Sequence, residues 1–232
     1  MLIEACRPTV DGRPRLSFDQ VPENKVAVLG ERIELVCDVY ASPNAIISWT
    51  KAGQTIRHFD PTSIESMANL DFDKVLAMSN TMTKLVIPCA NASSAGVYTC
   101  VVDNGCQKIA ASATVEIVDE ADVEGGSSKC HEFMNVAPTI TAWTDTRLER
   151  VDATVELLCR AEGSPKPRIS WYRLDDDEVR LPLVDELFLD NGDLLLPPKM
   201  PGSDGQVSLY QCVAENDFGI ASKIVMFYGT RA

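Results

Sequence analysis

Two stretches decide the fold: Ile33-Glu34-Leu35-Val36-Cys37 with Ile47-Ser48-Trp49, and Val155-Glu156-Leu157-Leu158-Cys159 with Ile169-Ser170-Trp171. In both, the tryptophan stands 12 residues after the cysteine. Farther along the chain, each tryptophan is followed by a second cysteine with a tyrosine two positions before it, at Tyr98–Cys100 and Tyr210–Cys212. Apolar and polar residues alternate around these positions, between Gly, Pro and Asn residues, which is typical of half-buried antiparallel strands. The chain therefore contains an internal repeat.

This repeat has a physical meaning in a sandwich of two sheets about 10 Å apart. A cysteine pointing inward from each sheet can form a disulfide, the tryptophan packs against it, and the tyrosine hydroxyl bonds back to the upstream backbone. We therefore predict an all-β chain of two tandem immunoglobulin-like β-sandwiches. The predicted disulfides are Cys37–Cys100 and Cys159–Cys212, and the predicted core residues are Trp49, Tyr98, Trp171 and Tyr210.

The predicted domain organisation follows from composition. Residues 1–118 form the first domain with an N-terminal segment, residues 119–135 an acidic linker with a Gly-Gly-Ser-Ser run, and residues 136–232 the second domain. In the second domain, the segments 163–167, 191–196 and 214–219 resemble intermediate-set immunoglobulin domains of neuronal and muscle adhesion proteins. The usual Asp-x-Gly-x-Tyr corner is altered in both domains, by Ser94 in the first and by Gln206 and Ser208 in the second. We expect looser tyrosine corners than usual.

The first domain carries an insert between Trp49 and a strand expected at 83–87. A strand is expected at about 54–59, and Thr62-Ser63-Ile64-Glu65 fits a capping box that starts a short helix or irregular flap over about 62–78. Large apolar residues in this flap have two interpretations. They cover the core or a sheet edge, or they form an adaptable binding patch, for which methionine is well suited. The candidate ligand contacts are Met67, Leu70, Phe72 and Val75.

Eight cysteines without a C-x-x-C pair favour disulfides and an oxidising, extracellular compartment. Four remain after the two core disulfides. Strand polarity places Cys6 and Cys106 at the entry end of the first domain, and Cys89 and Cys130 at its exit end. A strand of 6–8 residues separates the two ends by roughly 20–25 Å, whereas a disulfide needs Cα atoms within about 7 Å. We therefore predict the pairs Cys6–Cys106 and Cys89–Cys130.

Composition and motifs exclude several classes of function. The net charge of −13 makes nucleic acid a poor partner, and no run of 18 apolar residues predicts a membrane span. No nucleophile elbow, phosphate loop or metal motif is present, so we predict no enzyme activity, no metal and no cofactor. The run Asp175-Asp176-Asp177-Glu178 lacks the alternation of a calcium loop and is interpreted as a solvated loop. Asn91-Ala92-Ser93 is an N-glycosylation sequon at a predicted surface turn.

The sequence from Tyr98 to Val115, the turn at 191–195 and the two-domain length together resemble the secreted two-immunoglobulin-domain proteins of invertebrates. These are the nematode zwei-Ig proteins and the insulin-binding immunoglobulin proteins of insects. The resemblance covers about residues 17–228. It implies a secreted, non-catalytic binding protein that sequesters or modulates an insulin-like peptide or a related signalling ligand. The alternative is an extracellular adhesion or neuronal-maintenance module that acts through cell-surface partners or self-association.

Overall fold

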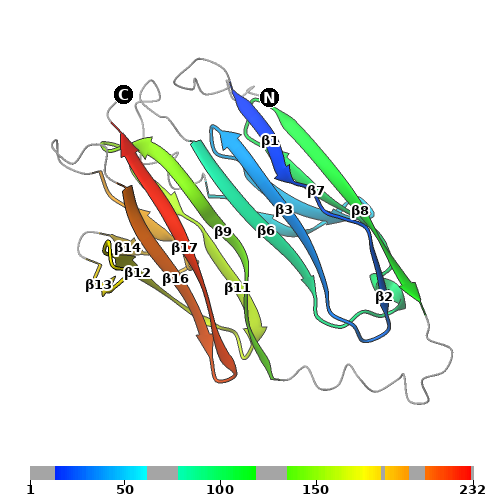
Figure 1. Cartoon of the computed structure of the whole chain (residues 1–232). Coiled ribbons are helices and arrows are strands. Elements are labelled where there is room, and N and C mark those ends of the chain that lie inside the picture. Colours follow the sequence, from blue (N-terminus) through cyan, green and yellow to red (C-terminus); the bar gives the residue numbers. More distant parts are fainter. Residues whose placement is uncertain (1–13, 62–77, 119–134, 184–185, 199–206, 231–232) are drawn as a thin grey trace.

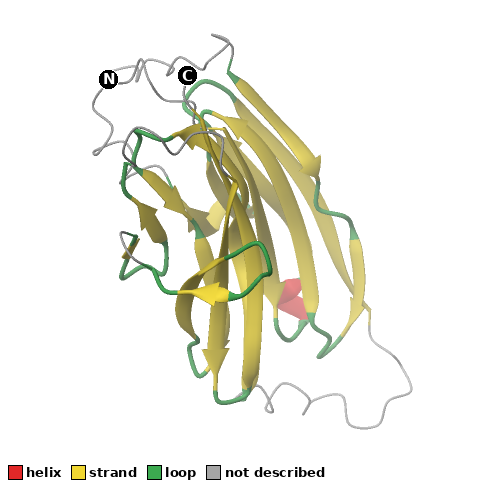
Figure 2. Cartoon of the chain, turned by 60° about the vertical axis from the view of Figure 1, so that its left-hand side comes forward, coloured by secondary structure: helices red, strands yellow, loops and turns green. Residues whose placement is uncertain are grey.

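The computed structural model describes residues 14–61, 78–118, 135–183, 186–198 and 207–230. Within these ranges the chain forms two β-sandwiches, and its one helical element is a 3-10 turn at Ala92–Ser94. The long strands run along the molecule, and β1 begins at the end of the molecule where β17 terminates (Figures 1 and 2). The chain has the predicted fold, two immunoglobulin-like β-sandwiches, and no helix in the described ranges is long and apolar enough to span a membrane.

The first sandwich consists of two layers, antiparallel except for the parallel pair β2 and β8. One layer is β1 (Arg15–Gln20), β3 (Ile33–Ser42) and β6 (Met78–Ile87); the other is β2 (Lys25–Val28), β8 (Lys108–Val118), β7 (Gly96–Asp103), β4 (Ile46–Lys51) and β5 (Gln54–Phe59). Strand β3 alternates buried and half-buried residues, as its sequence pattern predicts. Strand β5 has the predicted bounds, and β6 begins five residues earlier than the predicted strand at 83–87.

The second sandwich is built from nine strands. One group is β10 (Val155–Leu157), β15 (Leu194–Leu196) and β14 (Leu187–Phe188); the other is β12 (Arg168–Leu174), β13 (Arg180–Leu181), β16 (Val207–Asn216) and β17 (Gly219–Thr230). The two remaining strands, β9 (Val136–Arg150) and β11 (Cys159–Ser164), pair with each other. The strands of the first sandwich end at Val118 and those of the second begin at Val136.

The two sandwiches lie side by side and share a sheet. Strand β9 of the second domain pairs antiparallel with β6 of the first, from Met78 opposite Leu148 to Thr83 opposite Ala142. This pairing joins the strands in the order β1-β3-β6-β9-β17-β16-β12-β13, visible as neighbouring ribbons in Figure 1. Backbone hydrogen bonds between β6 and β9 therefore join the two predicted domains, in addition to the covalent chain that connects them.

Strand β9 changes partner halfway along its length. Its first half pairs with β11, from Val136 to Trp143, and its second half pairs in parallel with β17, from Thr146 to Arg150. The register against β6 shifts between these halves, so that Asp145 has no opposite residue. Such a bulge bends the strand and increases its twist. The bend carries β9 from one layer of the second sandwich to the other while its remaining edge stays paired to β6.

The two domains also share apolar packing. The core of the first domain surrounds Cys37, Trp49 and Cys100, and it includes Ala142 and Leu158 from the second domain, both fully buried. Leu158 stands at the break between β10 and β11, where its N–H donates to Thr144 Oγ1 at 3.0 Å. In the other direction, Met82 of β6 packs against the core of the second domain. Removing either domain would expose core side chains of the other.

Candidate binding surface

Both predicted core disulfides are formed in the structure. Cys37–Cys100 and Cys159–Cys212 each join Cα atoms 6.6 Å apart. The adjacent indoles are hydrogen-bonded as well as buried: Trp49 Nε1 donates to Thr83 Oγ1 at 3.1 Å, and Trp171 Nε1 donates to Gly192 O at 2.9 Å. These partners satisfy the one polar group that each buried indole carries.

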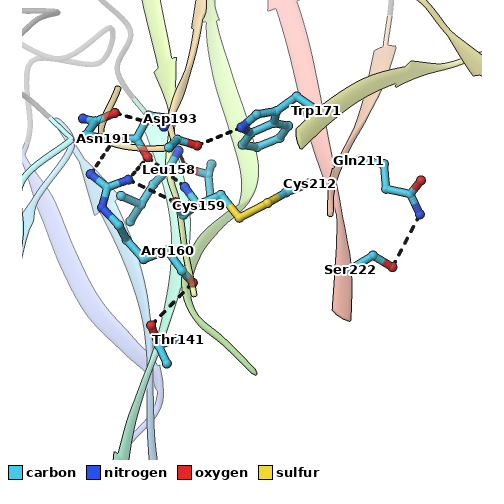
Figure 3. Close-up of a disulfide and its surroundings, with 12 residues drawn as sticks. Thr141, Leu158, Cys159, Arg160, Trp171, Asn191, Asp193, Gln211, Cys212 and Ser222 are labelled. Carbon is cyan, nitrogen blue, oxygen red and sulfur yellow. Dashed lines mark hydrogen bonds and ion pairs between the residues drawn. A yellow bond between two sulfur atoms is a disulfide. The ribbon is translucent and has the colours of Figure 1, made fainter. Parts of the chain in front are cut away.

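A buried carboxylate, which sequence analysis missed, organises the second disulfide. Asp193 is fully buried; it accepts a hydrogen bond from the Cys159 N–H at 2.9 Å and forms an ion pair with Arg160, whose Nη2 lies 2.7 Å from Oδ2 (Figure 3). The Asp193 N–H donates to Asn191 Oδ1 at 3.0 Å. The Asn-Gly-Asp turn therefore fixes β11 beside the disulfide.

The two predicted tyrosine corners differ in the structure. Tyr98 Oη donates to the Ser94 carbonyl at 2.8 Å, so the first corner is closed even though Ser94 stands at the usual aspartate position. Tyr210 Oη donates instead to Glu186 Oε1 at 3.0 Å. Burial, followed by the negative charge of Glu186, raises the pKa of Tyr210 above its usual value. The expectation of a loose corner is therefore wrong for the first domain, and the second domain replaces the corner with a side-chain contact.

The remaining predicted site residues are only partly described. Cys89 and Cys106 are both disulfide-bonded, at opposite ends of the first domain: Cys89 follows β6, and Cys106 lies in the turn whose Asn104 contacts Arg15 O and Ser42 O at 3.3 Å. Cys6 and Cys130 lie outside the described residues. The pairs Cys6–Cys106 and Cys89–Cys130 therefore stay predictions, which mass spectrometry of non-reduced peptides can test. The candidate contacts Met67, Leu70, Phe72 and Val75 also lie outside them.

The structure shows an apolar surface that the sequence analysis did not identify. Along β17, Ile224, Met226 and Tyr228 point outward and are 42%, 44% and 37% exposed. Pairing registers place Leu209 opposite Met226, Val207 and Leu148 opposite Tyr228, and Met78 opposite Leu148. We call the pairing of β6 with β9 the seam. One row of residues crosses it from β3 to β17, in the order Tyr40, Asn80, Thr146 and Met226, each opposite the next. We call this surface the seam face; its apolar members are Tyr40, Met78, Leu148, Val207, Leu209, Ile224, Met226 and Tyr228.

Three carboxylates, here called the seam carboxylates, border this row. Asp38 lies two residues before Tyr40 on the same side of β3; Asp19 accepts a hydrogen bond from Asn80 Nδ2 at 2.7 Å. Asp145 occupies the bulge of β9 beside Thr146. The three come from β1, β3 and β9, so both domains contribute to the group.

Asp38 is electrostatically unfavourable in its charged form. Its pKa is raised to about 6, first by burial and then by the negative charges of Asp19 and Asp145, and hydrogen bonds from Val39 and Asn80 oppose the shift. Its Oδ1 and the Oδ1 of Asn80 are buried atoms without a hydrogen-bond partner in the described part of the chain. On β17, Lys223 lies 4.4 Å over the Trp143 ring. Trp143 Nε1 and Thr146 Oγ1 donate to Asp145 at 3.5 Å. Among the described residues no cation pairs with the seam carboxylates, so the group keeps its net negative charge.

A second feature of the seam is a small interdomain cavity of about 200 Å³. It is lined by Arg32, Val86, Pro88, Val136, Thr139 and residues 162–164. Arg32 Nη2 donates to Thr139 Oγ1 at 2.7 Å, and the ion pair between Arg57 and Glu162 joins β5 to β11 at 2.7 Å. These polar contacts hold the domains together beside the shared core.

Two motifs from the sequence, the acidic run and the sequon, lie in turns of the described ranges. No group of three or more His, Cys, Asp or Glu side chains there could hold a metal ion. The acidic run from Asp175 closes a turn, because Asp175 Oδ1 accepts hydrogen bonds from the N–H groups of Asp177 and Val179 at 3.0 and 2.7 Å. The sequon asparagine is exposed and caps the 3-10 turn, accepting from Ser93 N–H at 2.9 Å.

Comparison with known proteins agrees with this geometry. Residues 16–117 match the immunoglobulin I-set domain, and residues 137–216 match an immunoglobulin domain. The Caenorhabditis elegans Zwei Ig domain protein zig-4 is 32% identical over 87% of this chain and 74% of its own length, and zig-3 is 31% identical over 94% and 82%. The crystal structure of neural ectodermal development factor IMP-L2 superposes with a TM-score of 0.68 at 22% identity, covering 94% of this chain and 95% of that one.

Proposed function

Because the chain belongs to the zwei Ig domain proteins of the immunoglobulin superfamily, we propose that it is a secreted, non-catalytic protein that sequesters an insulin-like peptide. The observation that carries the proposal is the seam face, which presents partly exposed apolar side chains from both domains. Contiguous exposed apolar patches in soluble proteins mark interaction sites.

The rigidity of the seam supports this function. Strands β6 and β9 are hydrogen-bonded, and Ala142 and Leu158 are buried in the other domain's core. A binding surface that spans two domains retains its shape only if the domains do not move relative to each other. A preformed surface costs less ordering entropy on binding than a mobile one. The fold similarity to IMP-L2 supports this arrangement of domains, and the resemblance to insect insulin-binding proteins suggests the class of ligand.

The test is titration of the purified chain with a panel of insulin-like peptides, read by calorimetry and by size-exclusion elution. Met226→Asp places a charge in the centre of the seam face and should weaken binding by tenfold or more, since central apolar contacts dominate interface energies. Val26→Asp is the matched control, because Val26 is 65% exposed on β2, away from the seam face. Binding of no peptide in the panel would contradict the proposal.

An adhesion or neuronal-maintenance role is the second candidate, and the same surface bears on it. A sheet face with exposed Ile224 and Met226 could also pair with a second copy of the chain. Sedimentation analysis at increasing concentration distinguishes the two. Self-association that Met226→Asp abolishes, without peptide binding, would favour the adhesion role.

A further inference from the structure

The seam carboxylates lie where a ligand on the seam face would cover them. Asp38 is two residues from Tyr40 on the same side of β3, and Asp145 precedes Thr146, which lies opposite Met226. Asn80, whose amide contacts Asp19, is in the same cross-strand row as Tyr40 and Thr146. The apolar and the acidic parts of this surface are therefore continuous.

Covering these carboxylates has an energetic cost unless the ligand supplies a positive charge. Asp38 Oδ1 and Asn80 Oδ1 already lack partners among the described residues, and a charge removed from water without compensation is strongly disfavoured. The groups that face Asp38 are Asp19 and Gln20 on β1, Asn80 and Met82 on β6, and Asp145 and Trp143 on β9. On β17, Lys223 is engaged with the Trp143 ring. None of the facing groups on β1, β6 and β9 is a cation.

We propose that the seam face selects a partner that presents a lysine or arginine within an apolar patch, with the basic group inserted between Asp19, Asp38 and Asp145. This inference rests on the proposed function and specifies the chemistry of its ligand. A basic side chain would compensate the carboxylates, and its apolar neighbours would cover Met226 and Tyr228. The net charge of −13 also favours the approach of such a partner.

The position of Asp38 implies that the affinity for the ligand depends on pH. Bound next to a cation, Asp38 must be ionised, whereas in the free protein its pKa is raised to about 6. Binding at pH 5 therefore has to release a proton, and affinity should fall as the pH drops from 7 to 5. Replacement of Asp38 by asparagine should remove most of that dependence.

The experiment uses the insulin-like peptide that binds the wild-type chain most tightly. The double variant Asp19→Asn/Asp38→Asn should bind it about tenfold more weakly at low salt, and its affinity should depend less on salt, and less on pH between 7 and 5, than that of the wild type. The control Asp176→Asn/Asp177→Asn removes the same charge from the exposed turn at β12–β13 and should change affinity less than twofold. Replacing each basic residue of the peptide by glutamine should identify one whose loss is not additive with the double variant.

The outcomes separate the two proposals. If a peptide binds, Met226→Asp weakens it, and the double variant binds like the wild type at every salt concentration and pH, then the ligand does bind the seam face but the carboxylates do not select it; this inference alone is overturned. If no peptide binds the wild-type chain, the proposed function fails, and this inference fails with it.

Discussion

In both domains the first stretch of the chain contributes to both layers of the sandwich, but it passes between the layers in different ways. In the first domain the chain leaves one sheet at Gln20 and enters the other at Lys25, so β1 pairs with β3 and β2 pairs with β8. The intervening Pro22 has no N–H to donate to a ladder. In the second domain β9 is continuous over 15 residues and changes sheets through a bulge at Asp145.

This difference explains the shape of the molecule. A broken strand presents two short edges, whereas a continuous one presents a long edge that must be paired or protected. Strand β9 pairs that edge with β6, which is itself the outer strand of its layer in the described first domain. Strand continuity in one domain thus produces the seam, the shared core and the surface proposed to bind a ligand.

The largest expected effect comes from weakening the contact between the two domains. Leu158→Ala leaves a cavity in the first domain although Leu158 belongs to the second, and buried leucine truncations cost about 2–5 kcal/mol. We expect a loss of about 3 kcal/mol in chemical denaturation, with both domains unfolding in one transition. Leu187→Ala is the control, since Leu187 is 57% exposed. Separate transitions for the two domains in the wild-type protein would contradict the shared-core interpretation.

An effect of intermediate size on stability is expected at the two tyrosines, Tyr98 and Tyr210. Tyr98→Phe removes a buried hydrogen bond to Ser94 O and should cost about 1–2 kcal/mol. Hydrogen exchange should accelerate at the 3-10 turn of Ala92–Ser94. Tyr210→Phe should instead accelerate exchange near β14, because its partner Glu186 immediately precedes that strand. Acceleration at the same relative position in both domains would show that the corners are equivalent after all.

A smaller effect concerns the charge at the seam. The folded-state pKa of Asp38, about 6, lies above its ordinary value of 3.8, so the folded state holds this proton more strongly than the unfolded state. Asp38 therefore makes the protein less stable as the pH rises from about 4 to 6, and this destabilisation persists at neutral pH. Asp38→Asn should raise the melting temperature by a few degrees at pH 7 and lose this advantage near pH 4. Equal shifts at both pH values would contradict this electrostatic origin.

The smallest expected effect concerns the glycosylation sequon, which only the first domain carries, in the turn between β6 and β7. In a secretory host, Asn91→Gln should reduce the mass of the protein by one glycan. Stability should change by less than about 1 kcal/mol, because the asparagine cap of the 3-10 turn is exposed. An unchanged mass would show that the sequon is not used.

The elements that depend on local pattern could be predicted from the sequence. Alternation around Cys37 and Cys159, the position of each tryptophan and the Asn-Gly-Asp turn predicted the strands, both sandwiches and the core disulfides. A tyrosine two residues before a cysteine predicted a buried ring, but it did not specify the partner of the hydroxyl. Ser94 and Glu186 become partners through the path of the chain around each ring.

The way in which the two domains combine follows from tertiary contacts, the β6–β9 pairing and the shared core. Pairing of β6 with β9 joins strands about 60 residues apart, and each strand alone has the pattern of an ordinary half-buried strand. Nothing in the local sequence assigns Ala142 and Leu158 to the core of the other domain. The seam face and its carboxylates arise from that pairing, because residues on β3, β6, β9 and β17 become neighbours only when the edges of two sheets meet.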